Sequence, residues 1–208
     1  IVPCWVASPK QEFGAYTLRP KLHKLIPEFL DEFPRVTRQK DPVKISKKYS
    51  EWKKIAFNEK DLLIPAGEQA AKKQLKHFFA NGLAAYDNHR NDPNGNAQSG
   101  LSPYLHYGNI SAQRIVIELM NKIGRKDVKS LYEDAFFEEL AVRRELADNF
   151  CFYNENYDNP DGFPDWAKKS WEKHKDDKRE YLYTKKEFEH AKTHDALWNA
   201  AQMEMVST

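Results

Sequence analysis

The chain has 208 residues, which is enough for one large domain or for one domain with part of another. Its 33 lysines and arginines nearly balance 31 aspartates and glutamates, so only a local basic patch, and not the net charge of +2, could attract nucleic acid. Its 8 glycines are few for a turn-rich all-β fold, and its 2 distant cysteines argue against a disulfide framework or a zinc site. No apolar run is long enough to cross a membrane, and we expect a soluble protein of a reducing compartment.

The N-terminal part has the pattern of the end of an α/β domain. Residues 1–6 form an apolar run that predicts one buried strand. A helix is predicted next, with Pro20 in its first turn and Pro34 at its end. Its apolar face consists of Leu18, Leu22, Leu25, Ile26, Phe29, Leu30 and Phe33.

The following residues, 35–66, are charged and weakly periodic, and we interpret them as a linker or covering segment. Trp52 within it is expected to anchor on a neighbouring surface. The chain begins without Met, and its last residues, 203–208, contain no helix-stop signal. We therefore expect this sequence to be an excerpt from a longer polypeptide.

From Gly67 the pattern becomes helical, and residues 90–98 then have the composition of a loop. The first predicted helix ends near Asn88, with Ala71, Leu75, Phe78, Phe79, Leu83 and Tyr86 on one face. Later residues predict further helices. One covers residues 112–123 and is stopped by Gly124, and another is Lys-rich and contains Trp166 and Trp171. A third opens with a capping box at Thr184 and Glu187, and the last follows residues 193–195.

Residues 99–111, SGLSPYLHYGNIS, combine small residues with the start of a helix. Ser99 and Ser102 offer hydroxyls, Pro103 suits a first helical turn, and Ser111 is a candidate N-cap for the next helix. A loop that leads into a helix N-terminus can bind a phosphate. A Ser-Pro turn can also serve only as a helix cap, and the local sequence leaves both interpretations open.

Residues 129–153 predict one long helix whose apolar stripe contains a charged pair. Glu139 and Arg143, one turn apart, fall within that stripe, whereas Glu138 and Glu145 are expected to be ordinary surface charges. The pair is either an internal salt bridge at the edge of the core or part of a cavity that receives a polar ligand. The stripe contains Tyr132, Ala135, Phe136, Leu146 and Phe150, and the opposite face Glu133, Asp134, Arg144 and Asp148.

Four segments together resemble one known family. Residues 99–114 resemble the flavin-phosphate segment of the DNA photolyase and cryptochrome family, and residues 138–150, EELAVRRELADNF, resemble the lesion-facing helix of class II cyclobutane pyrimidine dimer photolyases. Residues 192–203 and 2–8 are also similar to class II sequences. The resemblance implies a mainly α fold, with a helical FAD-binding domain from residue 67 to residue 208.

The family resemblance also implies a domain that precedes the helical one. Residues 1–34 would then be the last strand and helix of a Rossmann-like α/β antenna domain, and residues 35–66 the linker between the two domains. A second, antenna chromophore in the rest of that domain is a further expectation.

The resemblance implies positions for both a cofactor and damaged DNA. Arg90 and Asn91 would meet the DNA around a flipped pyrimidine dimer, Glu139 would hydrogen-bond the dimer, and Arg143 would lie at the same opening. Glu139, Arg143 and Asn91 are the expected catalytic residues, although some relatives have Trp in place of Arg143. FAD would be held by Tyr86, Gln98, Ser99, Gly100, Leu101, Ser102, Leu105, Gln113, Trp198 and Asn199, with residues 99–102 on its pyrophosphate.

The activity implied by this family is light-dependent repair of ultraviolet-damaged double-stranded DNA. Excited, reduced FADH⁻ passes an electron to the flipped-out dimer, the cyclobutane ring splits, and the electron returns. We expect a monomeric carbon–carbon lyase in the cytoplasm, the nucleoid or the nucleus, with no metal and no membrane partner. Two alternatives are a cryptochrome-like blue-light sensor without repair and a flavin-free helical module that binds nucleic acid. Glu139, Arg90 and Asn91 favour repair over sensing, and the phosphate segment argues against the flavin-free module.

Overall fold

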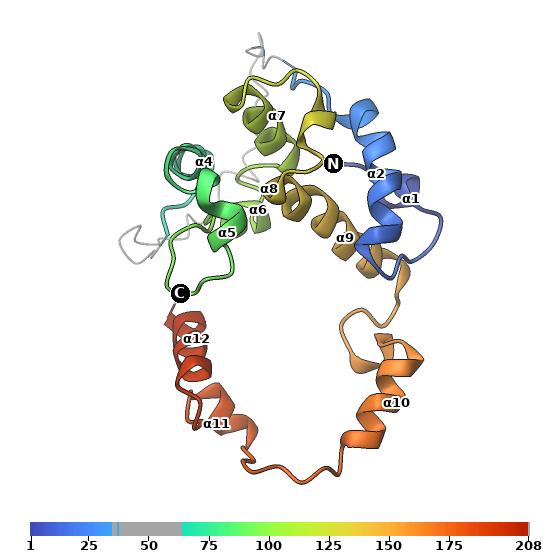
Figure 1. The fold of residues 1–208 in the computed structure, drawn as a ribbon, viewed down its shortest axis with the longest axis vertical. Coiled ribbons are helices and arrows are strands. Elements are labelled where there is room, and N and C mark those ends of the chain that lie inside the picture. Colours follow the sequence, from blue (N-terminus) through green and yellow to red (C-terminus); the bar gives the residue numbers. More distant parts are fainter. Residues whose placement is uncertain (35–36, 38–63, 208) are drawn as a thin grey trace, which may run out of the picture. The chain divides into compact units, whose positions relative to one another are not determined.

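The computed structural model describes residues 1–34, 37 and 64–207. The chain divides into two compact units, Ile1–Tyr157 and Asp158–Thr208. The elements of the described residues are all helical, which confirms the predicted mainly α fold (Figure 1). The predicted Trp52 anchor and nearly all of the predicted linker lie outside the described residues.

The first unit contains short and long helices in close succession. Its α-helices are α1 (Cys4–Ala7), α2 (Ala15–Phe29), α4 (Glu68–Asn81), α5 (Tyr86–His89), α6 (Ser102–His106), α7 (Ala112–Lys122), α8 (Ala135–Phe137) and α9 (Arg144–Tyr153). Two 3₁₀ turns, η2 (Leu83–Ala85) and η3 (Val128–Leu131), and one π-helix, η4 (Glu138–Arg143), complete it.

The predicted strand at residues 1–6 is wrong. Pro3 precedes the helical turn α1, and the extended Ser8 ends it. The described residues contain no strand with which this apolar run could pair, and a lone strand is not stable in water. Val2 and Ala7 are instead buried, at 2% and 5% exposure, in the core that α1 forms with α2 and α9.

Helix α2 confirms the predicted apolar spacing but has different ends. It begins at Ala15 and ends at Phe29, so Pro20 lies beyond the first turn and Pro34 beyond the helix. Leu18, Leu22 and Ile26 are fully buried. Pro27, inside the helix, has no amide hydrogen for the carbonyl of His23, and the hydroxyl of Tyr132 donates to that carbonyl instead. The helix continues past Pro27 because a neighbouring segment satisfies the freed acceptor.

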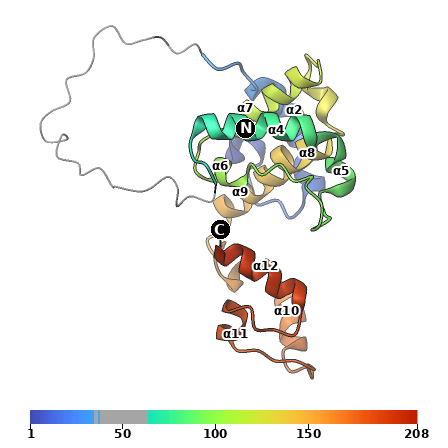
Figure 2. The same ribbon diagram turned by 90° about the vertical axis from the view of Figure 1, so that its left-hand side faces the viewer.

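The segment from α8 to α9 forms the centre of the first unit. Figures 1 and 2 show it between α4 and α5 on one side and α1 and α2 on the other. Because it is covered from both sides, three consecutive residues, Leu140, Ala141 and Val142, are all buried. Helices α4 and α7 also pack together, with Leu75, Phe78, Ile115 and Leu119 in the shared core.

The prediction of one continuous helix over residues 129–153 is wrong. Asp134, expected on the solvated face, is an N-cap, since its carboxylate accepts the amide hydrogen of Phe137 at 2.8 Å. The chain therefore restarts a helix at α8, passes through the π-helix η4 and continues as α9. The extra residue accommodated by the π-helix changes which side chains face the core. Glu145, expected at the surface, is buried at 3% exposure as a result.

The local helix signals in the rest of the chain are confirmed. Ser111 caps α7 by accepting the amide hydrogen of Arg114 at 3.1 Å, and Gly124 follows that helix with a left-handed φ of 67°. The predicted helix after Gly67 is observed as α4, η2 and α5, with a break at Gly82.

The second unit contains η5 (Pro160–Gly162), α10 (Asp165–His174), α11 (Lys185–Glu189) and α12 (Ala196–Ser207). Thr184 and Glu187 form the predicted capping box, and the carboxylate of Asp195 accepts two amide hydrogens at the start of α12. Its large apolar side chains, Trp166, Trp171, Leu182 and Leu197 among them, are exposed. Across both units, none of the described helices combines the length and apolar character needed to cross a membrane.

Candidate functional site

The small-residue segment folds as a tight turn that leads into α6. Gly100 has a left-handed φ of 64°, a conformation that glycine adopts without strain. The amide of Leu101 donates to the hydroxyl of Ser99 at 3.3 Å, and α6 begins at Ser102 with Pro103 in its first turn. Gly100 and Ser102 are exposed. An exposed turn of small residues before a helix allows an anionic group to approach the backbone closely.

A side chain of helix α4, Gln74, supports this turn. The side-chain amide of Gln74 donates to the carbonyl of Ser99 at 2.8 Å. A Cβ atom on Gly100 would lie 2.7 Å from Nε2 of Gln74, closer than such atoms pack. Gln74 thus contacts both the backbone of Ser99 and the face of Gly100 that lacks a side chain. The tight packing fixes the shape of the turn.

A second group of predicted residues meets where α5 packs against α8. The ring of Tyr86 is buried, edge-on to Phe78 and Phe136 at centroid distances of 5.7 and 5.3 Å. The guanidinium of Arg90 lies 5.7 Å from the centre of the Tyr86 ring, within the range of a cation–π contact. Burial raises the pKa of Tyr86, and the negative charge of Glu139 raises it further. Tyr86 and Arg90 are therefore in contact, and Glu139 is the neighbouring negative charge that acts on Tyr86.

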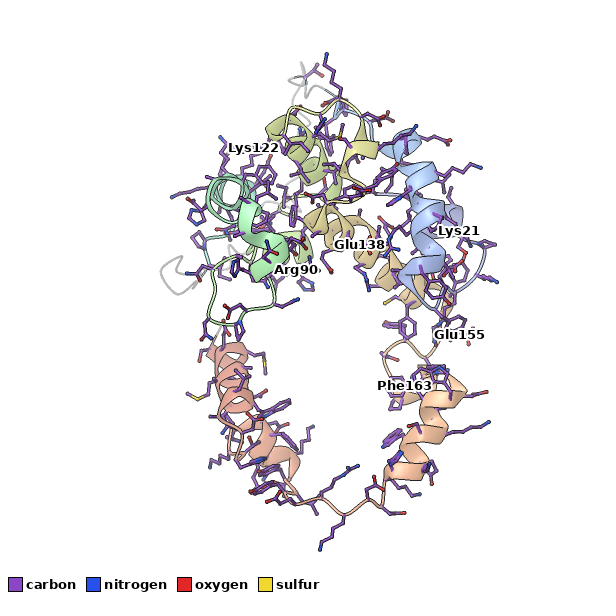
Figure 3. All side chains as sticks on the ribbon, in the orientation of Figure 1. Lys21, Arg90, Lys122, Glu138, Glu155 and Phe163 are labelled. Carbon is purple, nitrogen blue, oxygen red and sulfur yellow. The ribbon has the colours of Figure 1, made fainter. Side chains whose placement is uncertain are left out.

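Of the two interpretations of the charged pair, the internal salt bridge between Glu139 and Arg143 is not observed among the described residues. Nε of Arg143 donates instead to Glu138 at 3.1 Å, and Glu138 also accepts two hydrogen bonds from Arg19 at 2.9 and 2.7 Å. These contacts with Arg19, and more weakly with Arg143, hold the pKa of Glu138 below its usual value. Figure 3 labels Glu138 in the middle of the first unit and Arg90 directly after α5. Glu138 is thus the partly buried centre of two ion pairs and not the ordinary surface charge that the sequence predicts.

The other predicted site residues of the first unit have identified environments. The side-chain amide of Gln98 donates to the carbonyl of Arg90, and that of Gln113 donates to Asp31 at 2.7 Å. Asn91 is exposed. Leu101 is buried at 1% exposure, so any contact it makes with a ligand must come from its backbone. Leu105 is partly buried against the core.

The remaining two predicted residues, Trp198 and Asn199, belong to the second unit. The ring of Trp198 lies edge-on to Phe188 at 5.3 Å. The side chain of Asn199 accepts hydrogen bonds from the amide and hydroxyl of Thr193, at 3.0 and 2.8 Å, and donates to its carbonyl at 2.8 Å. Asn199 therefore fixes the loop before α12.

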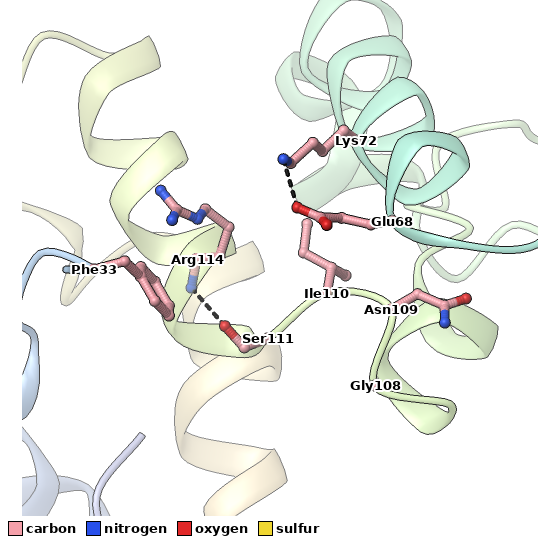
Figure 4. Close-up of a pocket in the computed structure, with 8 residues that line it drawn as sticks. All are labelled: Phe33, Glu68, Lys72, Gly108, Asn109, Ile110, Ser111 and Arg114. Atoms are coloured by element: carbon pink, nitrogen blue, oxygen red, sulfur yellow. Dashed lines mark hydrogen bonds and ion pairs between the residues drawn. The ribbon is translucent and has the colours of Figure 1, made fainter. Parts of the chain in front are cut away.

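Two pockets border the small-residue segment. One, of about 380 Å³, lies along α4 and is lined by Pro65, Ala70, Lys73, Gln74, His77 and Tyr104. The other, of about 390 Å³, lies at the start of α7 and is shown in Figure 4. It is lined by Phe33, Glu68, Lys72, Gly108, Asn109, Ile110, Ser111 and Arg114. The described residues contain no cluster of three or more side chains suited to hold a metal ion.

Sequence reasoning missed Arg19, Glu138 and Gln74. Arg19 and Glu138 are 119 residues apart, so no local pattern connects them. Glu138 and Arg143 are five residues apart, a spacing that only a π-helix brings to one side. Gln74 adjoins the apolar face of α4, and its spacing gives no indication of a contact with Ser99.

The chain is similar to known proteins over nearly its whole length. A deoxyribodipyrimidine photo-lyase of Potorous tridactylus is 42% identical over 99% of this chain and 40% of its own length. One of Oryza sativa subsp. japonica is 45% identical over 99% of the chain and 43% of its own length, and one of Methanothermobacter thermautotrophicus is 34% identical over 100% and 46%. No protein-family model matches. The chain spans less than half the length of these curated relatives, and its similarity to them supports its identification as a fragment of a photolyase-family protein.

Proposed function

We propose that this chain is part of an enzyme that repairs cyclobutane pyrimidine dimers in DNA in a light-dependent reaction. The observation that carries the proposal is its identity of 34–45% with proteins named deoxyribodipyrimidine photo-lyase. These names favour repair over blue-light sensing. The assignment to class II rests on the resemblance of residues 138–150 and 192–203 and is part of the proposal.

The cofactor we propose is FAD, and the turn at residues 99–102 fits its phosphates. Gly100 and Ser102 are exposed, and Gln74 supports the turn from the other side. Backbone amides at such a turn can donate to phosphate oxygens. When bound and reduced, the flavin supplies the electron that splits the cyclobutane ring after light is absorbed. Tyr86, Gln98, Leu105, Gln113, Trp198 and Asn199 are the further proposed contacts.

The proposed lesion contacts are Glu139, Arg90, Arg143 and Asn91. The Glu139 carboxylate has acceptor oxygens for the imide N–H groups of a thymine dimer taken out of the duplex. Arg90 and Arg143 carry positive charge for neighbouring phosphates, and the exposed Asn91 can hydrogen-bond the DNA. A damaged base pair stacks poorly, so its extrusion costs less than that of an intact pair. The protein's part is to bind and orient the dimer.

The test uses the full-length protein and DNA that carries one thymine dimer. We expect the purified protein to absorb as a flavoprotein and to restore the DNA under blue light. Equal repair in darkness, or none under light, would refute the proposal. Glu139→Gln should slow repair by about a hundredfold with flavin retained, since it removes a charged hydrogen-bond partner of the dimer. A colourless Glu139→Gln protein would show that Glu139 supports the fold instead.

A further inference from the structure

A bidentate ion pair joins α2 to the centre of the first unit. Arg19 on α2 uses Nε and Nη2 to donate to the two carboxylate oxygens of Glu138, at 2.9 and 2.7 Å. Such paired, parallel hydrogen bonds are the geometry in which an arginine fixes the direction of a carboxylate. The side chain of Glu138 is 19% exposed, so water competes little for it.

Glu138, the partner of Arg19, is the first residue of the π-helix η4. Arg143, the last residue of η4, donates to the same carboxylate at 3.1 Å. Residues five apart lie about 140° apart around an α-helix, whereas i→i+5 hydrogen bonding brings them close to one line. The contact between Glu138 and Arg143 is therefore favoured by the π-helical form of the segment.

Glu139, the next residue along η4, depends on this form. It directly follows Glu138, the residue that Arg19 and Arg143 hold, and its negative charge raises the pKa of Tyr86 on α5. If η4 relaxed to an α-helix, the register would change by one residue and the affected side chains would turn by about 100° around the axis. With α9 held by its contacts with α1, the direction of Glu139 relative to Tyr86 would then change.

We propose that Arg19 and Glu138 are positioning residues that hold η4 in its π-helical form and so aim Glu139 at the flipped dimer. This inference rests on the proposed repair function. It adds to that function a positioning contact from Arg19, which lies 119 residues before Glu138 in the chain. Arg19 itself need not touch the DNA. Its effect passes through Glu138 and the backbone of η4.

The experiment compares full-length wild type with Arg19→Gln, Arg19→Lys and the control Lys185→Gln. Lys185 forms an exposed ion pair with Glu189 on α11. The measured quantities are bound flavin, the ratio of affinities for dimer-containing and undamaged DNA, and hydrogen exchange of residues 136–146. Arg19→Gln should retain flavin, lower the affinity ratio about tenfold and speed exchange in this segment. Arg19→Lys keeps the charge but loses the two parallel hydrogen bonds, so it should recover part of the affinity ratio. Lys185→Gln should match wild type.

A double-mutant cycle separates positioning from general stabilisation. If Arg19 acts through Glu139, Arg19→Gln should have no further effect on the affinity ratio once Glu139→Gln is present. Additive effects, or an unchanged ratio in Arg19→Gln with flavin bound, would overturn the inference. If Arg19→Gln loses its flavin, Arg19→Lys and Glu138→Gln make the same comparison. Wild type with no preference for damaged DNA would instead refute the proposed function itself.

Discussion

Two carboxylates in the first unit receive a cation from α2, and they differ in how completely they are enclosed. Glu12 precedes α2 and pairs with Lys21, and its side chain is 5% exposed. Glu138 pairs with Arg19, and its side chain is 19% exposed. Glu12 also accepts the hydroxyl hydrogen of Ser8 at 2.6 Å. Both carboxylates have a lowered pKa, with the hydrogen bond from the α2 cation as the largest cause.

The partners of the two carboxylates indicate different roles. The backbone amide of Glu12 donates to Asn149 of α9 at 2.7 Å, and the hydroxyl of Tyr153 donates to Ser8 at 2.6 Å. The Glu12 network thus joins the loop before α2 to α9 and lies apart from the proposed site residues. The Glu138 network adjoins Glu139 and includes Arg143. We infer that the first network mainly stabilises the fold and the second mainly orients the site.

Removal of the Glu12 carboxylate should have the largest effect on stability. Glu12→Ala leaves Lys21 without its carboxylate and the Ser8 hydroxyl without its acceptor, so we expect a loss of about 2–3 kcal/mol in the free energy of unfolding. Urea denaturation of the full-length protein measures it. Glu68→Ala, which breaks the exposed pair with Lys72, is the control and should change stability little. An equally small effect of Glu12→Ala would show that its network is not a stabilising one.

The pH dependence of stability should identify Glu12 directly. Its pKa is lowered from 4.5 to about 2, so its stabilising effect is complete above pH 4.5 and disappears as the pH falls towards 2. We expect the stability difference between wild type and Glu12→Gln to decrease by about 2 kcal/mol over that interval. Urea denaturation at several pH values measures this difference. A difference independent of pH would mean that the Glu12 charge is not what stabilises the network.

A third contact, from Gln74 to the turn at Ser99, tests whether a site can also be oriented without an ion pair. Gly100→Ala places a Cβ 2.7 Å from Gln74 in a left-handed backbone conformation, which we expect to cost about 1 kcal/mol. Bound flavin per protein should fall with it, measured by absorbance. Gly108→Ala is a matched control, because Gly108 is also left-handed but has open space around its Cβ position. Equal flavin loss in both variants would indicate that strain alone, and not the contact with Gln74, is responsible.

The parts of this molecule that could be predicted from sequence depend on neighbours in the chain. The N-cap at Ser111, the stop at Gly124 and the capping box at Thr184 follow from residues within one helical turn, and the structure has all three. The run at residues 1–6 has the composition of a buried strand, but only a partner strand could make it one. Its helical turn is therefore a consequence of packing against α2 and α9.

The candidate site follows the same rule. The turn at residues 99–102 could be proposed from its local sequence, and Tyr86, Arg90 and Glu139 as separate site residues from the family resemblance. The π-helix could not, because a π-helical insertion leaves the apolar spacing ambiguous until the neighbouring helices are known. Glu139 therefore stays a prediction from the family resemblance, whereas the sequence gives no sign of the contact between Arg143 and Glu138 and leaves Arg19 out altogether.

Of the two carboxylate networks, the one at Glu138 should contribute less to stability, and Glu138→Gln tests whether it mainly orients the site. Glu138 is more exposed than Glu12 and its amide replacement keeps the size of the side chain, so we expect a loss of only about 0.5–1 kcal/mol. The preference for dimer-containing DNA should nevertheless fall about tenfold, because η4 loses the charge that Arg19 and Arg143 hold. Glu12→Gln should show the reverse, with lower stability and an unchanged preference at temperatures where it is folded. If both variants lowered stability and preference in proportion, the two networks would have one role, and the π-helix would be held by packing alone.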